Sequence, residues 1–124
     1  MNRILFFGYT GFADQMKASS LMNELTARGY ECFLIDPSCY VLQVGEIVLA
    51  PDTKVCMNVN PGTLPEPFIL FCGLSGDSFQ EAVDICKGNI RAVLTQSNSE
   101  MTVYELAGHL SEERRLEQRV KPQP

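Results

Sequence analysis

Two short apolar runs divide the chain into halves of similar design. Residues 4–7 (Ile-Leu-Phe-Phe) and 69–72 (Ile-Leu-Phe-Cys) are each followed by a glycine, a variable residue, a small hydroxyl residue and a second glycine. Five of the eight aligned pairs in residues 4–11 and 69–76 are identical. A run of about four apolar residues is typical of a buried strand, and repetition over this interval predicts two structural units built alike.

Each apolar run precedes an amphipathic segment with helical spacing. Apolar residues recur at i, i+3, i+4 and i+7 in both segments, at Ala18, Leu21, Met22 and Leu25 and again at Phe79, Ala82, Val83 and Cys86. A glycine follows each segment, Gly29 in the first half and Gly88 in the second. Glycine adopts the left-handed conformation that ends a helix, so both residues are predicted helix stops.

A second strand and a second helical segment complete each half. Residues 32–35 and 91–94 have the length of short buried strands. Residues 41–48 and 103–110 again show helical spacing, and the latter segment starts with Thr102 and Glu105, which form a capping-box pattern. Each half is therefore predicted to be a βαβ unit with an additional helix.

These units predict an α/β fold with a parallel sheet of about four strands. Right-handed crossovers favour the strand order 2-1-3-4, with two βαβ pseudo-repeats and helices on both faces. A parallel arrangement would bring the two glycine turns side by side at the carboxyl edge of the central strands, where open α/β sheets bind ligands.

The segment 51–67 separates the halves. It carries prolines at 51, 61, 65 and 67 and is predicted to be a connector, with a possible extra edge strand near residues 54–59. A domain boundary is the alternative. Because each half alone has few strands, we expect residues 1–124 to form one domain, with residues 1–50 and 68–120 sharing one sheet.

The net charge, the cysteines and the single histidine limit the partners, the compartment and the metal sites that we expect. A formal net charge of -5 disfavours nucleic acid and anionic membranes, and the apolar runs are too short to span a bilayer. Five cysteines without a CxxC pair favour reduced thiols in the cytoplasm. With one histidine and no ligand spacing, no metal site is predicted.

The first glycine turn resembles the nucleotide-binding start of extended short-chain dehydrogenases. Residues 8–14 (Gly-Tyr-Thr-Gly-Phe-Ala-Asp) follow a GxTGxxG pattern in which Asp14 replaces the third glycine. The resemblance implies that Gly8, Thr10, Gly11 and Asp36 bind a dinucleotide. The alternative is that both turns need glycine for their geometry, with Thr10 and Ser75 as helix caps. On that interpretation the chain uses no cofactor.

A longer resemblance covers the second half. Residues 68–75, residues 92–98 and the closing helix to Glu113 are similar to an uncharacterised bacterial family, domain of unknown function 3783. Met101 stands where that family has a tryptophan. The likeness draws attention to four residues at the strand ends as ligand-binding candidates: Gly73, Ser75, Thr95 and Asn98. Ordinary turn and cap bonding is the alternative role for the last two.

Catalytic groups are hard to assemble from the sequence. Cys72 stands at a strand end near a helix start, which favours a reactive thiol, but its partner in the repeat is Phe7, which indicates a buried position. His109 falls near the apolar stripe of the last helix. No catalytic triad follows from the spacing, so no catalytic residue is assigned.

The sequence therefore predicts a non-enzymatic binding or regulatory module whose partner is a small molecule or a protein. A homodimer through the last helix and through Tyr9, Tyr40 and Tyr104, taken as exposed, is a further expectation. The alternative is a small nucleotide-binding protein or enzyme whose site lies at the carboxyl edge of the sheet.

Overall fold

Four strands form one open sheet in the computed structural model, which describes residues 2–52 and 63–120. The spatial order is β2-β1-β3-β4, as predicted. The strands are β1 (Arg3–Phe7), β2 (Glu31–Leu34), β3 (Phe68–Cys72) and β4 (Ile90–Val93). The extra strand predicted near 54–59 lies outside the described residues.

The sheet is mixed, so the prediction of a wholly parallel sheet is wrong. Strand β1 runs parallel to β2, and β3 runs parallel to β4, but the two central strands are antiparallel. Arg3 lies opposite Cys72, and Phe7 lies opposite Phe68. The carboxyl end of β1 therefore lies beside the amino end of β3.

The connection between the halves explains the direction of β3. After β2 the chain passes along the sheet through a 3₁₀ helix, η1 (Pro37–Val41), and helix α2 (Val44–Leu49). This passage ends near the start of β1, where Nη1 of Arg3 donates a hydrogen bond to the Val48 carbonyl. Pro67 lies against Gly8, at the end of the sheet where β1 stops, so β3 starts there and runs against β1. The handedness rule constrains the βαβ units but not this connection.

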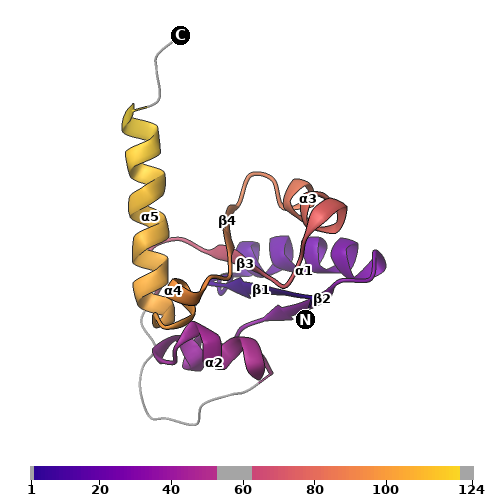
Figure 1. Cartoon of the computed structure of the whole chain (residues 1–124), viewed down its shortest axis with the longest axis horizontal. Coiled ribbons are helices and arrows are strands. Elements are labelled where there is room, and N and C mark those ends of the chain that lie inside the picture. Colours follow the sequence, from indigo (N-terminus) through magenta and orange to yellow (C-terminus); the bar gives the residue numbers. More distant parts are fainter. Residues whose placement is uncertain (1, 53–62, 121–124) are drawn as a thin grey trace.

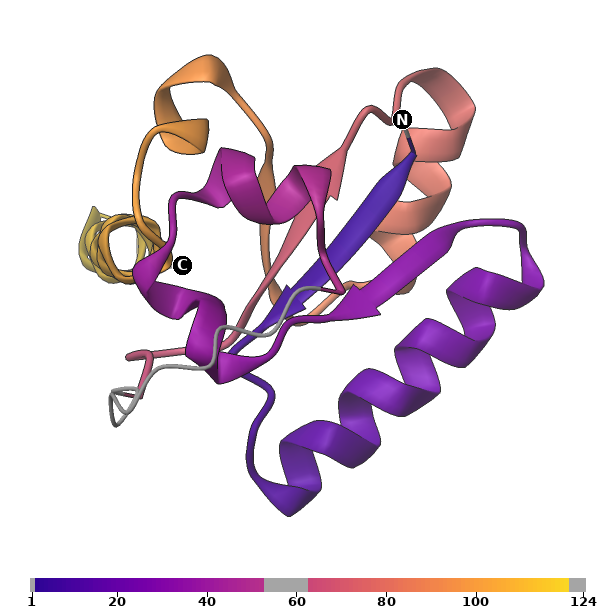
Figure 2. The ribbon, with the colours of Figure 1, turned by 90° about the horizontal axis from the view of Figure 1, so that it is seen from below.

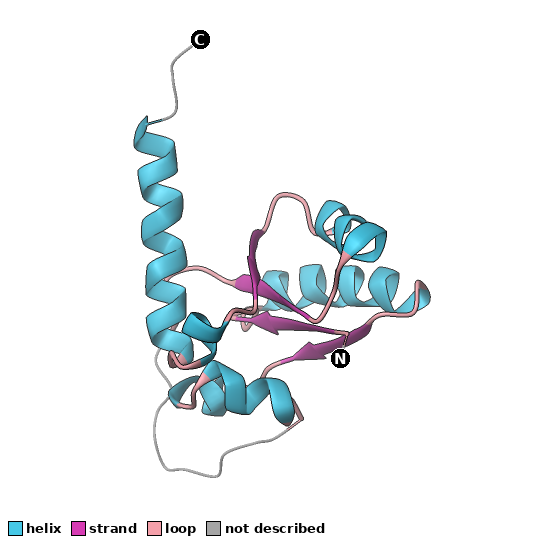
Figure 3. Ribbon diagram, viewed as in Figure 1, coloured by secondary structure: helices cyan, strands magenta, loops and turns pink. Residues whose placement is uncertain are grey.

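Helices cover both faces of the sheet, but the two crossover helices are not on opposite faces, where right-handed units in a wholly parallel sheet would place them (Figures 1 and 3). The crossover helices of the two halves, α1 (Phe12–Ala27) and α3 (Gly76–Ile85), share one face. The other face carries η1, α2 and α5 (Val103–Val120), and the short helix α4 (Gln96–Ser99) lies against α2. Figure 2 shows η1 and α2 crossing the near face of the strands.

The two central strands form the middle of the core. All of β3 and residues 4–7 of β1 are buried. Alternate residues serve two separate apolar clusters: Leu5 and Leu70 pack toward α2 and α5, whereas Ile4 and Ile69 pack toward α1 and α3. Helices on both faces thus explain why these strands are continuously apolar.

Local signals placed the helix ends well. Gly29 and Gly88 have φ of +95° and +91°, the left-handed conformation predicted for them. The Thr102–Glu105 capping box is present, since the Glu105 amide donates to Oγ1 of Thr102 at 3.2 Å. The prediction for Thr10 is wrong, because Gly11 occupies the N-cap of α1.

The second helical segments of the two halves meet beside the sheet. Gln43 and Thr102 form an antiparallel bridge, and the Val44 amide donates to the Met101 carbonyl at 2.8 Å. A Cβ at Gly45 would lie 3.0 Å from the carbonyl oxygen of Ser99, so a larger residue here would require the backbone of α4 to shift. The far end of α5 extends away from the sheet (Figure 1).

Candidate functional site

The two glycine turns lie at opposite ends of the sheet. Gly8 follows β1, and Gly73 follows β3, and these strands are antiparallel. The predicted meeting of the two turns at one carboxyl edge is therefore wrong. The candidate residues divide into two separate sets, one for each half of the chain.

A cleft of about 450 Å³ lies at the carboxyl ends of β1 and β2. We call it the β1–β2 cleft; it is lined by Tyr9, Thr10, Gln15, Leu34, Ile35, Asp36, Pro37, Pro51 and Asp52. It brings together two residues of the first predicted set, Thr10 and Asp36. Gly8 and Gly11 are in the adjoining turn and do not line the cleft. Local βαβ geometry explains this proximity, because parallel neighbours end at the same edge.

Packing within the protein accounts for glycine at position 8. Its φ is +86°, and a Cβ there would lie 2.9 Å from Cα of Pro67 and 3.2 Å from Leu64. Its amide donates to the hydroxyl of Tyr40 at 2.7 Å. The turn is therefore filled by protein atoms at the point where a dinucleotide fold would approach a pyrophosphate.

The start of α1 is the second part of the supposed phosphate loop. Gly11 is extended, and Oδ2 of Asp14 lies 3.8 Å from the position of a Cβ on Gly11. A carboxylate here offsets the positive potential of the helix N-terminus. Nε2 of Gln15 donates to the Thr10 carbonyl at 2.8 Å, which fixes the turn against the helix.

Asp36 shapes the opposite wall of the cleft. Its Oδ1 accepts a hydrogen bond from the Ser38 amide at 2.9 Å and caps η1. The carboxylate is half-buried, so it lies at the boundary between the core and solvent. The cap therefore gives Asp36 a structural role beside any role in binding.

Tyr9 joins this cleft to a second one. Its side chain is buried, and its hydroxyl donates to Oδ1 of Asn89 at 3.1 Å. Burial is the main cause of the raised pKa of this phenol. The expectation that Tyr9 and Tyr40 are exposed is wrong, because each is at most 2% exposed. A homodimer thus stays a prediction, without these two side chains as its contacts.

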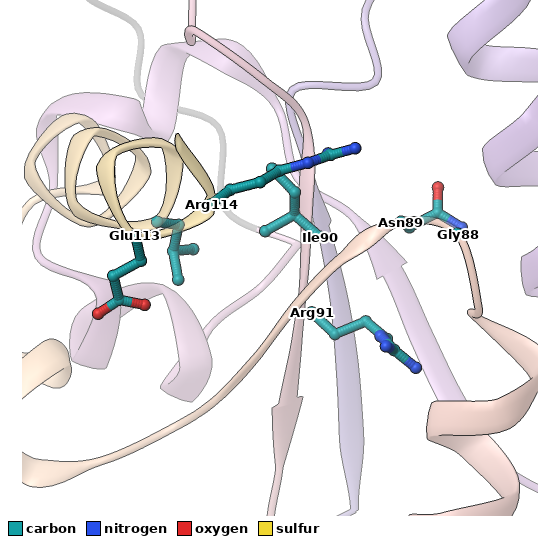
Figure 4. A pocket seen from close by; sticks show the side chains of 7 residues that line it. Gly88, Asn89, Ile90, Arg91, Glu113 and Arg114 are labelled. Carbon is teal, nitrogen blue, oxygen red and sulfur yellow. The ribbon is translucent and has the colours of Figure 1, made fainter. Parts of the chain in front are cut away.

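The second cleft lies between the start of β4 and α5 and has a volume of about 400 Å³. Its lining comprises Gly88, Asn89, Ile90, Arg91, Leu110, Glu113 and Arg114. Figure 4 shows Arg114 extending over Ile90, while the Arg91 guanidinium is directed away from α5. Arg91 donates to the Val83 carbonyl of α3 at 2.9 Å. The sequence singled out none of these residues as a site.

The other predicted set lies at the far end of the sheet. Thr95 and Asn98 form a reciprocal capping box: the Thr95 amide donates to Oδ1 of Asn98 at 2.8 Å, and the Asn98 amide donates to Oγ1 of Thr95 at 3.1 Å. Nδ2 of Asn98 also donates to the Val93 carbonyl at 2.9 Å. Ser75 is the N-cap of α3 without a side-chain cap bond, and Gly73 has φ of +74°. Thr95 and Asn98 therefore make the turn and cap hydrogen bonds that were the alternative role for these two residues.

Cys72 lacks the environment of a reactive thiol, and His109 lies away from the core. Cys72 is buried, and burial raises the pKa of its thiol to about 12 despite the opposing charge of Arg3. His109 is exposed on α5, so its predicted place near the apolar stripe is wrong. Within the described ranges, no group of three or more metal-ligating side chains occurs, and no helix there has the length and apolarity needed to cross a membrane.

The fold and clefts define a class: an open, mixed α/β sheet with a cleft beside an edge strand. Residues 67–116 match the model of a family described as Domain of unknown function (DUF3783), as the motifs of the second half predicted. The match begins next to β3 and ends within α5, so the similarity to this family covers the second half of the fold. No curated protein and no solved structure matches the chain.

Proposed function

We propose that the protein is a non-enzymatic binding or regulatory module that holds its ligand in the β1–β2 cleft. The observation that carries this proposal is the cleft itself. It combines polar groups on Thr10, Gln15 and Asp36 with the exposed side chain of Leu34. Binding sites commonly pair an apolar lining with a few polar groups that fix orientation.

The exposed end of α1 supports the same location. Phe12 and Met16 are 83% and 60% exposed, and residues four apart share one helix face. Gln15 is their neighbour on the helix and lines the cleft. Large apolar side chains gathered beside a cleft are typical of a surface that a partner covers.

The two halves also support an origin by duplication, which we propose with the function. Phe6 pairs with Leu34 in the first half, and Phe71 pairs with Val93 in the second, at corresponding places in each βαβ unit. Buried reduced thiols at Cys72 and elsewhere support a reducing compartment such as the cytoplasm.

Amide chemical shifts of the ¹⁵N-labelled chain test the binding proposal. The titrants are nucleotides, amines, amino acids and short peptides. We expect a bound compound to shift the amides of residues 9–15, of Leu34 to Asp36 and of Asp52. A response confined to the Gly73 and Thr95 end, or none from the whole set, would contradict the proposal.

Nucleotide binding is the second candidate, because the cleft joins Thr10 and Asp36 as the dehydrogenase resemblance implies. Titration calorimetry with NAD, NADP and ATP tests it. The variant Asp14→Gly restores the third glycine and removes a carboxylate from the first helical turn. If the loop binds phosphate, this variant should bind more tightly than the parent. Absence of heat from both proteins would exclude this candidate.

A further inference from the structure

Two clefts flank the edge strand β2. One is the β1–β2 cleft; the other, also about 450 Å³, is lined by Arg3, Glu31, Phe33, Leu49, Ala50, Pro51 and Asp52. Pro51 and Asp52 belong to both. Phe33 and Leu34 are consecutive in β2 but line different clefts, because side chains alternate between the faces of a strand.

Among the described residues, no strand pairs with the outer side of β2, and β2 pairs with β1 alone. The Ile35 amide donates to the Phe6 carbonyl, so by strand alternation the Leu34 amide is directed away from β1. An edge with outward backbone groups can accept an extended peptide as an added strand.

Exposed apolar side chains stand on both sides of this edge. Leu34 is 44% exposed toward the first cleft, and Leu49 is 73% exposed at the second. An added strand would place its successive side chains alternately over the two faces of the sheet, and hence toward the two clefts. Apolar side chains in that strand would cover these leucines.

The charge around the edge indicates the sign of the partner. The first cleft is lined by Asp36 and Asp52, and the second by Glu31 and Asp52. Arg3 is the one basic residue among the described residues that line either cleft, and its Nε donates to Glu31 at 2.8 Å. A second copy would bring the same carboxylates together, which is unfavourable, whereas lysine or arginine side chains would complement them.

We propose that the outer side of β2 binds an extended peptide segment of another protein, one that carries apolar and basic side chains. This proposal rests on the proposed binding function and names the partner class for that site. Main-chain hydrogen bonds to β2 would supply affinity, and the two clefts would select side chains.

Fluorescence anisotropy with two labelled probe peptides tests the proposal. One peptide alternates leucine and lysine, and the other alternates leucine and glutamate. We expect the lysine peptide to bind at least about tenfold more tightly than the glutamate peptide. Equal affinities, or no binding of either peptide, would overturn the proposal.

Pairs of matched variants test whether the peptides bind along β2. Asp52→Lys should weaken binding of the lysine peptide about tenfold and strengthen binding of the glutamate peptide. The control is Glu100→Lys, which makes the same charge change at an exposed position outside both clefts and should alter either affinity by less than about twofold. Leu34→Asp should also weaken binding about tenfold. Its control is Val93→Asp, which changes the 47% exposed last residue of the opposite edge strand.

The outcomes separate the two proposals. If a small ligand shifts the amides of the β1–β2 cleft but neither peptide binds, the peptide proposal fails and the proposed function stands. If the lysine peptide shifts amides away from β2, or Glu100→Lys has as large an effect as Asp52→Lys, the peptide proposal fails. Sedimentation showing a dimer that Leu34→Asp dissociates would overturn it in favour of a second copy.

Discussion

Leu5 and Leu70 lie directly opposite each other in the antiparallel pair of central strands. They are the second residues of the two repeated apolar runs, so the sheet pairs each half with its own counterpart. The Gln43–Thr102 bridge pairs the residues that precede α2 and α5 in the same way. An approximate twofold axis perpendicular to the sheet relates these contacts, which explains why the two glycine turns are at opposite ends.

Replacement of Gly8 by alanine should destabilise the protein more than the same change at Gly29. Both glycines have positive φ, but a Cβ at Gly8 would meet Cα of Pro67 at 2.9 Å, whereas a Cβ at Gly29 meets nothing within 4 Å. We expect Gly29→Ala to cost about 1 kcal/mol and Gly8→Ala about 2 to 4 kcal/mol. Urea denaturation of both variants measures this difference. Equal losses would show that residues 64–67 do not constrain the turn.

Asn98→Ala should lower the free energy of unfolding by about 1 to 2 kcal/mol. The substitution removes the acceptor for the Thr95 amide and the donor to the Val93 carbonyl. Ser97→Ala, at the exposed neighbouring position, is the control and should change stability by less than about 0.5 kcal/mol. If Asn98→Ala were as stable as the control, the capping role would be refuted, and the ligand-binding role of Thr95 and Asn98 would gain support.

Cys72 should resist alkylation in the folded protein at neutral pH. Its thiol is buried, with a pKa raised to about 12 by loss of solvation, and the thiolate is the reactive form. Iodoacetamide treatment followed by peptide mass spectrometry should find Cys72 unmodified until urea unfolds the chain. Preferential labelling of Cys72 in the native state would restore it as a candidate nucleophile.

Stability should decrease as pH rises above about 9. Burial raises the pKa of Cys72 from 9.0 to about 12 and that of Cys86 from 9.0 to about 11. The unfolded chain therefore releases these protons first, so the stabilisation is complete below pH 9 and is lost as pH rises through 11 and 12. Urea midpoints measured from pH 7 upward test this dependence.

The variant Cys72→Ala provides the control for that dependence. Its absolute stability will be lower, because a buried side chain is truncated. The quantity to compare is the slope of the unfolding free energy against pH, which should be shallower than in the parent above pH 9. An unchanged slope would mean that the Cys72 thiol does not contribute.

Much of the fold could be predicted from local patterns in the sequence. The continuously apolar residues of β1 and β3 predicted central strands, and Gly29 and Gly88 predicted helix stops, because each signal depends on near neighbours. The direction of β3 has no such signal. A strand that is apolar on both faces has the same pattern in either direction, and residues 51–67 show no periodicity that fixes the path between the halves.

The same distinction between local patterns and long-range contacts explains which residues of the candidate site were predicted. Thr10 and Asp36 were predicted together because one βαβ unit places both at one edge. Tyr9 was assigned to an exposed dimer surface instead, because a tyrosine in a turn resembles a surface residue. Its hydrogen-bond partner Asn89 belongs to the other half of the chain, and no local sequence pattern predicts a hydrogen bond between residues so far apart. Gln15 was missed because a polar residue on a helix usually faces solvent.

The antiparallel junction between β1 and β3 also determines what one half would do alone. A fragment that ends before β3 would uncover the inner side of β1, with its row of backbone donors and acceptors. In the whole chain, β1 meets a strand of nearly its own sequence that runs in the opposite direction. The closest substitute is β1 of a second fragment, so the separated half should assemble into a symmetric pair resembling the intact molecule.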